Sequence, residues 1–290
     1  MVYRRVIQLS PTTKVVSLPS RWLSANKVKK GDYVNIEDSG NKIIIETTKS
    51  GNKSMSSDLT SLRDTLLWTA IDSFYMLGYS HIELKLTVEQ KKLMNKIVKY
   101  FPMLMIASET KTALELNTVS DNLDMDFDKT IQHVRHITNN IVDEALSLIE
   151  IKDWETLAKI KKMDYDLNIY ISVCFRHLNS GKIANAISWA QFVKMLELYS
   201  DRLCIMFKQI ADSKSCGKID IDAIKRIRNL YDDSFKLLDK FTIQKANEHE
   251  EDRRLVRLSS EKSSLYNHFY ELTQSIYDIH EIIFQLHHDI

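Results

Sequence analysis

The chain has 290 residues, of which 44% are hydrophobic, and its formal net charge is +1. This length predicts two or three domains, and only six glycines and three prolines favour long helices over an all-β fold. The most apolar stretch, Phe101–Ala107, is too short to span a bilayer, and no sustained apolar run follows Arg4 and Arg5. We therefore expect a cytoplasmic protein without membrane insertion. Its three cysteines lack metal-ligand spacing, which indicates reduced thiols.

The first fifty residues predict a small, mostly β module. Its expected elements, in chain order, are a strand at Tyr3–Leu9, a strand at Thr12–Pro19, a short helix at Ser20–Val28, and a hairpin of Lys29–Glu37 and Asn41–Glu46 that turns near Ser39-Gly40. A module this small rarely closes a hydrophobic core alone without a metal, disulfides or a second copy. Since the segment has neither cysteines nor clustered metal ligands, we expect an interleaved dimer of hairpins.

Positive charge is concentrated in the same segment. Residues 1–50 hold nine Lys and Arg against four Asp and Glu, a charge of +5, so the rest of the chain carries −4. A dimer would double this positive charge on one small module, which is typical of a surface that binds DNA. An ordinary lysine-rich, solvated surface is the alternative interpretation.

A small α/β unit is expected over residues 58–120, after a polar linker at Lys49–Ser57. Its first helix would be capped by Ser57 or Asp58 and would end at Gly78. That helix would bury one stripe, formed by Leu59, Leu62, Leu66, Ala70, Phe74 and Leu77. The remaining expected elements are a strand at His81–Leu86, a helix at Glu89–Tyr100, and a hairpin of Met103–Ile106 and Lys111–Thr118. The unit shows no glycine-rich phosphate loop and no catalytic signature, so we do not expect an enzyme.

The remainder of the chain predicts an antiparallel helical bundle, which makes the fold class α+β multidomain. Mostly apolar residues recur at spacings of three and four, as in the run Ile131, Val134, Thr138, Ile141, Ala145 and Leu148. Similar runs extend over Trp189–Ile210 and Leu265–Ile290. The expected helices lie near 126–150, 153–178, 183–212, 220–245 and 248–290, with turns at Asn179–Lys182 and Ser213–Lys218.

The N-terminal segment resembles a known DNA-binding family over about residues 3–47. The motifs that carry the resemblance are V-V-S-L-P, S-R-W-L, K-K-G-D-Y-V and N-K-I-I-I-E, in that order. This order is similar to the swapped-hairpin DNA-binding domain of AbrB/SpoVT type. The resemblance implies that DNA meets the cations at the matching positions, which are Arg4, Arg5, Lys14 and Arg21. One departure is Trp22, which stands where bacterial members often carry a second arginine.

The helical part, roughly residues 124–290, resembles the PhoU family of phosphate-uptake regulators. The resemblance is carried by Trp154–Arg176 and Met195–Phe207. The family's metal-binding signature, an acid followed four residues later by Asp, matches Glu197-x-x-x-Asp201. In the last helix Gln274-x-x-x-Asp278 has Gln in place of the acid. Fusion of the two modules is similar to archaeal PhoU-type regulators, which implies transcriptional control of phosphate uptake.

Asp164 is a candidate site residue on independent grounds. It falls within a run of core positions, formed by Leu157, Ile160, Asp164, Leu167, Ile171, Cys174 and Leu178. A buried carboxylate needs a cation, a set of donors or a metal. Asp164 could join Glu197 and Asp201 around a divalent metal, for which oxygen ligands suit Mg, Ca, Mn or Fe. Alternatively, it could pair with an Arg or His of a facing helix, or face a cleft.

The other metal candidates have simpler interpretations. Glu197 and Asp201 lie opposite the apolar stripe of their helix, where an acid pair is most simply solvated. The same face carries Ala186, Ala190 and Cys204, so it could also be a second packing surface. His280, His287 and His288 lie near the end of the last helix, where imidazolium would favour the helix dipole.

The leading hypothesis is a homodimeric DNA-binding transcription regulator whose bundle senses a metal or a partner protein. The rival hypothesis is an adaptor of a phosphate transporter or sensor kinase, in which the N-terminal segment only dimerises.

Overall fold

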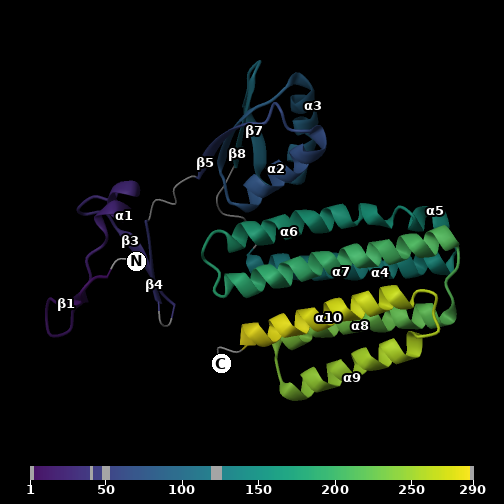
Figure 1. Cartoon of the computed structure of the whole chain (residues 1–290). Helices are drawn as coiled ribbons and strands as arrows, with labels where there is room; N and C mark the ends of the chain where they lie inside the picture. The colour runs from purple at the N-terminus through teal and green to yellow at the C-terminus, as the bar shows by residue number, and fades with distance from the viewer. Residues whose placement is uncertain (1–2, 40–41, 48–52, 119–125, 288–290) are drawn as a thin grey trace. The chain divides into compact units, whose positions relative to one another are not determined.

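The protein divides into two compact units, Met1–Asn52 and Lys53–Ile290, which we call the N-terminal unit and the C-terminal unit (Figure 1). The computed structural model describes residues 3–39, 42–47, 53–118 and 126–287. Among these residues, no helix is both long and apolar enough to cross a bilayer.

The N-terminal unit has the predicted order of elements. In chain order they are β1 (Ile7–Gln8), β2 (Lys14–Val15), α1 (Ser20–Ala25), β3 (Val34–Ser39) and β4 (Lys42–Thr47). β1 pairs antiparallel with β2, and β3 pairs antiparallel with β4. The first two strands are shorter than expected. Gly40, at the predicted hairpin turn, lies outside the described residues.

The first part of the C-terminal unit is a sheet with two helices, which we call the sheet segment. Its elements are β5 (Ser54–Asp58), α2 (Asp64–Met76), β6 (His81–Lys85), α3 (Val88–Ile97), a 3-10 turn η1 (Val98–Tyr100), β7 (Leu104–Glu109) and β8 (Ala113–Thr118). Within the described residues the strand order is β5-β6-β8-β7, with β5 parallel to β6 and the other pairs antiparallel. The parallel pair requires a crossover connection, and α2 provides it. The predicted strand is β6, on which Ile82 and Leu84 point inward and are fully buried.

The beginning of the sheet segment differs from prediction. Ser54–Ser57, assigned to the linker, belong to β5, while residues 49–52 lie outside the described part of the chain. Asp58 does not cap a helix: it ends β5 and accepts hydrogen bonds from Thr60. Because serine and polar residues dominate β5, its sequence carries little of the apolar alternation by which a strand is recognised.

The buried face of α2 also differs from prediction, because the helix begins at Asp64 instead of directly after Ser57. Its buried residues are Leu67, Ile71 and Tyr75, spaced four apart, whereas Leu66 is 49% exposed. Gly78 follows the helix with φ of +81°, a left-handed conformation that favours glycine, as expected at this end.

The rest of the C-terminal unit is a bundle of long helices lying side by side (Figure 1). In chain order they are α4 (Phe127–Glu150), α5 (Trp154–Leu157), a 3-10 turn η2 (Ile160–Lys162), α6 (Asp164–Leu178), α7 (Ala186–Ser213), α8 (Lys218–Asp239), α9 (Ile243–Ser260) and α10 (Tyr266–His287). The apolar runs read from the sequence are the core of this bundle. Ile131, Val134 and Ile141 of α4 are at most 2% exposed.

Three predicted helices are interrupted. The helix expected over 153–178 is divided into α5, η2 and α6, although its run from Leu157 to Leu178 stays buried. The helix expected over 220–245 ends at Asp239, and α9 already begins at Ile243. The helix expected over 248–290 is divided into α9 and α10. Between α9 and α10, Ser263 Oγ accepts a hydrogen bond from the backbone N–H of Leu265 at 2.9 Å. Serine side chains compete in this way with helical hydrogen bonds, and residues 259–264 contain four serines.

Helix α6 belongs to both hydrophobic cores of the C-terminal unit. Leu167, Ile171 and Cys174 are buried in the core of the bundle, whereas Val173 is buried in the core of the sheet segment. Polar contacts reinforce this packing, because Arg176 donates to the backbone oxygen of Tyr75 at 2.8 Å. The sheet segment and the bundle therefore share α6 and belong to one compact unit.

Candidate functional sites

The four cations predicted to meet DNA are all exposed on the N-terminal unit. Arg4 and Arg5 precede β1, Lys14 lies in β2 opposite Gln8, and Arg21 is the second residue of α1. Within the described residues, none of these four side chains forms an ion pair with an acid. Their positive charge is therefore not neutralised locally and is available to an anionic partner.

Local sequence accounts for the positions of these elements. Pro19 precedes α1 in an extended conformation with φ of −63°, which the proline ring favours. Between α1 and β3, Gly31 has φ of +96°, and the Asp32 carboxylate accepts a hydrogen bond from the backbone N–H of Lys29 at 2.9 Å. This turn directs the chain into the β3–β4 hairpin.

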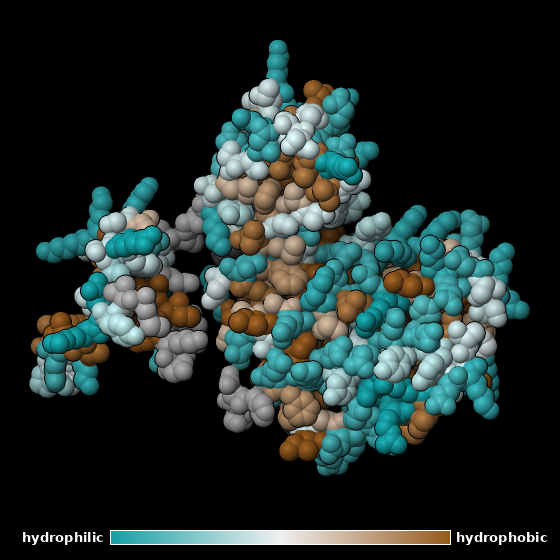
Figure 2. Space-filling model, viewed as in Figure 1, coloured by the Kyte–Doolittle hydropathy of each residue, from teal (hydrophilic) through white to brown (hydrophobic). Residues whose placement is uncertain are grey.

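Apolar side chains are also exposed on the N-terminal unit. Tyr3 is 85% exposed, Tyr33 is 84%, Leu9 is 72% and Ile43 is 68%. No residue of this unit is buried among those that the structure describes. Figure 2 shows brown hydrophobic side chains at the surface of this unit beside teal, hydrophilic ones. An isolated copy thus leaves much of its apolar surface in water, where such surface favours association.

Asp164, the carboxylate predicted to be in the core, is 2% exposed. It accepts hydrogen bonds from Ser200 Oγ of α7 at 2.8 Å and from Asn168 Nδ2 at 3.4 Å. Its partners are therefore a hydroxyl and an amide rather than the Arg or His that we considered. Burial raises the pKa of Asp164, and the negative charge of Asp201 adds to the rise, while the hydrogen bond from Ser200 opposes both.

Glu197 and Asp201 are half-buried on α7 and form separate ion pairs. Lys194 Nζ lies 2.7 Å from Glu197 Oε2, and Lys161 Nζ lies 3.8 Å from Asp201 Oδ1. Over the part of the chain that the structure describes, no group of three or more His, Cys, Asp or Glu side chains is arranged to hold a metal ion. Binding of a divalent metal by Asp164, Glu197 and Asp201 stays a prediction.

In the last helix, the two residues at the positions of the metal signature, Gln274 and Asp278, form hydrogen bonds within the protein. Gln274 Nε2 donates to Asp278 Oδ1 at 3.0 Å, and Gln274 Oε1 accepts from Arg257 Nη2 at 3.1 Å. These side chains tie α9 to α10.

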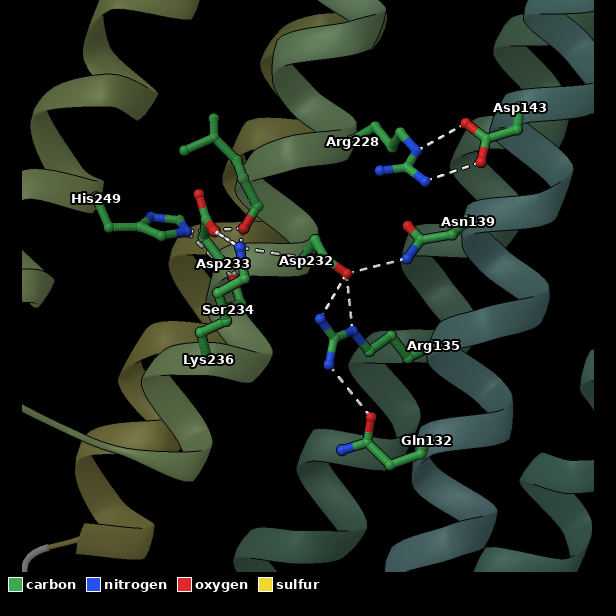
Figure 3. A network of polar contacts seen from close by, with 11 residues as sticks. Gln132, Arg135, Asn139, Asp143, Arg228, Asp232, Asp233, Ser234, Lys236 and His249 are labelled. Carbon is green, nitrogen blue, oxygen red and sulfur yellow. Dashed lines mark hydrogen bonds and ion pairs between the residues drawn. The ribbon is translucent and has the colours of Figure 1, made fainter.

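A polar network between α4 and α8 was not anticipated from the sequence (Figure 3). Arg135 Nη2 lies 2.7 Å from Asp232 Oδ1, which also accepts from Asn139 Nδ2 at 3.1 Å. Burial opposes ionisation of Asp232, but the hydrogen bonds and charge of Arg135 outweigh it and lower the pKa of this carboxyl. One turn away, Arg228 donates twice to Asp143, each time at 2.8 Å. These contacts fix the two helices relative to each other.

A buried pair of histidines was also missed. His249 of α9 and His280 of α10 are each 6% exposed, and their ring centroids are 4.1 Å apart. Burial, the charge of His249 and the charge of Arg253 together lower the pKa of His280 to about 3. The expectation that His280 would act as an imidazolium on the helix dipole is therefore wrong. His287 Nε2 lies 2.8 Å from the carbonyl oxygen of Leu238. His288 lies outside the described residues.

The chain was compared with known proteins in three ways. No protein-family model, no curated protein and no solved structure matches it. The resemblances to the AbrB/SpoVT and PhoU families thus rest on the quoted residues alone and stay predictions.

Proposed function

We propose that the protein is a homodimeric, DNA-binding transcription regulator whose N-terminal unit is completed by a second copy. The observation that carries the proposal is the exposed apolar surface of this unit beside four exposed cations. Interleaving two copies would bury side chains such as Tyr33 and Ile43. It would also bring two sets of cations onto one small module.

The cations suit the two tasks of a DNA-binding surface. Arginine and lysine neutralise phosphates, and arginine also reads guanine edges in the major groove with two hydrogen bonds. Arg4, Arg5 and Arg21 are exposed and form no ion pair within the described residues, so they can reach phosphates without losing a described contact with an acid. Phosphate uptake is the regulated process that the resemblance of the helical part implies, with the bundle sensing a metal or a partner protein.

The DNA-binding surface is tested by replacing three arginines together, Arg4→Ala, Arg5→Ala and Arg21→Ala. We expect loss of binding to chromosomal fragments in fluorescence anisotropy, with the helical circular dichroism unchanged. Wild-type affinity should fall with salt at a log–log slope of about −0.9 for each phosphate contacted. The matched control removes three exposed lysines of the sheet segment, Lys92→Ala, Lys96→Ala and Lys99→Ala, and should bind normally.

Dimerisation is tested by sedimentation equilibrium at micromolar concentration. The proposal requires twice the chain mass of 33.8 kDa. A well-folded single chain would contradict the proposed module. A stable dimer that binds no DNA would favour the adaptor hypothesis instead.

A further inference from the structure

A cavity of about 860 Å³ lies in the C-terminal unit between the sheet segment and the bundle. On one side it is lined by α2 and η1, and on the other by α6 and α7. Sites for small molecules usually measure roughly 300–1,000 Å³. The cavity is therefore large enough for a metabolite. The helices that line it are packed into the two hydrophobic cores of the unit.

Aromatic rings from both sides line this cavity. They are the rings of Trp68, Tyr100, Tyr165 and Phe175. The Trp68 and Tyr100 rings lie edge to face, with centroids 4.9 Å apart. Tyr100 and Tyr165 are 42% and 55% exposed, so they remain accessible to an incoming molecule. Aromatic faces attract cations through their quadrupoles and also cover alkyl groups.

Two carboxylates face the cavity from opposite sides, Asp72 from α2 and Glu197 from α7. Asp72 Oδ1 accepts a hydrogen bond from Ser172 Oγ at 2.6 Å, and Oδ2 has no protein donor among the described residues. Burial raises the pKa of Asp72, and the nearby charge of Glu197 raises it further, while the hydrogen bond from Ser172 and the charge of Lys194 oppose this rise. A cation placed between the two carboxylates would favour the ionised form of both.

The cavity disfavours anions. Its one lining cation among the described residues is Lys194, which is 64% exposed and already paired with Glu197 at 2.7 Å. An anionic ligand would meet two carboxylates and a neutralised lysine. The lining therefore selects for positive charge on the ligand.

We propose that this cavity binds an organic ammonium ion. Its charged group would lie against the aromatic faces between Asp72 and Glu197, and its alkyl part would cover Met76 and Ile171. Primary polyamines and quaternary ammonium compounds share this chemistry. All residues of the site belong to the C-terminal unit, so the test below uses none of the residues proposed to bind DNA.

The test is calorimetric titration of the full chain with spermidine and, separately, with choline, at matched ionic strength and without DNA. We expect at least one of them to bind, and Asp72→Asn to weaken that binding by about tenfold or more, as for loss of a charged hydrogen-bond partner. The matched control is Asp64→Asn, which removes the same charge from an exposed position on α2 outside the cavity. This control should bind as the wild type does.

Each outcome decides the proposal. Binding of spermidine alone identifies a primary ammonium site, and binding of choline alone identifies a quaternary one. Absence of binding by both at millimolar concentration overturns the proposal, as does equal weakening by Asp72→Asn and Asp64→Asn, which would indicate diffuse electrostatic attraction. If Asp72→Asn fails the check of folding by urea unfolding, Glu197→Gln decides in the same titration.

Discussion

In the C-terminal unit long helices bury whole stripes of apolar side chains, whereas in the N-terminal unit no described residue is buried. Phe269 of α10 is 0% exposed and Tyr33 of the N-terminal unit is 84% exposed. Both units nevertheless have regular hydrogen-bonded elements. Secondary structure alone therefore does not make a self-sufficient domain, which supports the proposal that the N-terminal unit folds with a second copy.

The largest expected difference between the units is in the free energy of unfolding that is lost when an aromatic ring is removed. Phe269→Ala should lower the free energy of unfolding of the C-terminal unit by about 3–5 kcal/mol, because it leaves a cavity in the core. Urea unfolding followed by far-ultraviolet circular dichroism measures this loss. Tyr33→Ala is the matched variant and should leave that transition unchanged. It should instead weaken self-association, measured by dilution. Equal losses of helical stability would contradict the comparison.

A second difference concerns pH, because the buried histidines lie in the C-terminal unit. The unfolded chain takes up a proton near the ordinary pKa of 6.5, whereas folded His280 resists protonation until about pH 3. Stability contributed by neutral His280 is therefore present above pH 6.5 and is lost as pH falls toward 3. The slope for one such proton is about 1.4 kcal/mol per pH unit.

The measurement is the free energy of unfolding from neutral to acidic pH for wild type and His280→Gln. The variant should show a shallower loss below pH 6.5, while His136→Gln, at an exposed position on α4, should follow the wild type. Asp72 and Asp164 act in the opposite sense, because burial raises their folded pKa values. Their stabilisation is present at low pH and lost as pH rises through those values. An unchanged slope in His280→Gln would show that His280 is protonated in the fold.

The smallest expected effects separate a half-buried ion pair from a more exposed one between α4 and α8 (Figure 3). Asp232 is 22% exposed and holds both Arg135 and Asn139, so Asp232→Asn should cost about 1–3 kcal/mol. Asp143 is 52% exposed, so Asp143→Asn should cost less than about 1 kcal/mol despite its bidentate contact with Arg228. Thermal unfolding of the two variants side by side gives the comparison, and similar losses would show that burial does not govern these pairs.

Periodicity predicted most of the bundle, because a long amphipathic helix repeats its signal over several turns. The run from Leu157 to Leu178 stays buried even though the backbone breaks into α5, η2 and α6. Short elements gave much weaker signals. Strand β5 is mostly serine. The apolar residues Leu59 and Leu62 fitted a helical stripe, so the helix was predicted to begin after Ser57, whereas α2 begins at Asp64.

Candidate sites were harder to predict than helices, since side chains from distant segments form them. The core position of Asp164 follows from its own helix, but its partner Ser200 lies 36 residues away. The pairing of His249 with His280 has a partial signal, because His280 lies four residues after Ile276 and three before Ile283, on the same face of the helix. The cavity between Asp72 and Glu197 depends on packing α2 against α6 and α7, which no local pattern specifies.

Helix α6 couples the stability of the sheet segment to that of the bundle. Its two faces complete different cores, with Leu167 in one and Val173 in the other. A fragment that started at Phe127 would leave Val173 uncovered and would deprive Arg176 of the Tyr75 and Tyr79 carbonyl groups. The sheet segment should therefore melt together with the bundle in a single cooperative transition. Any molecule that binds the folded protein between the sheet segment and α6 should raise the midpoint of this transition for the sheet segment and the bundle together.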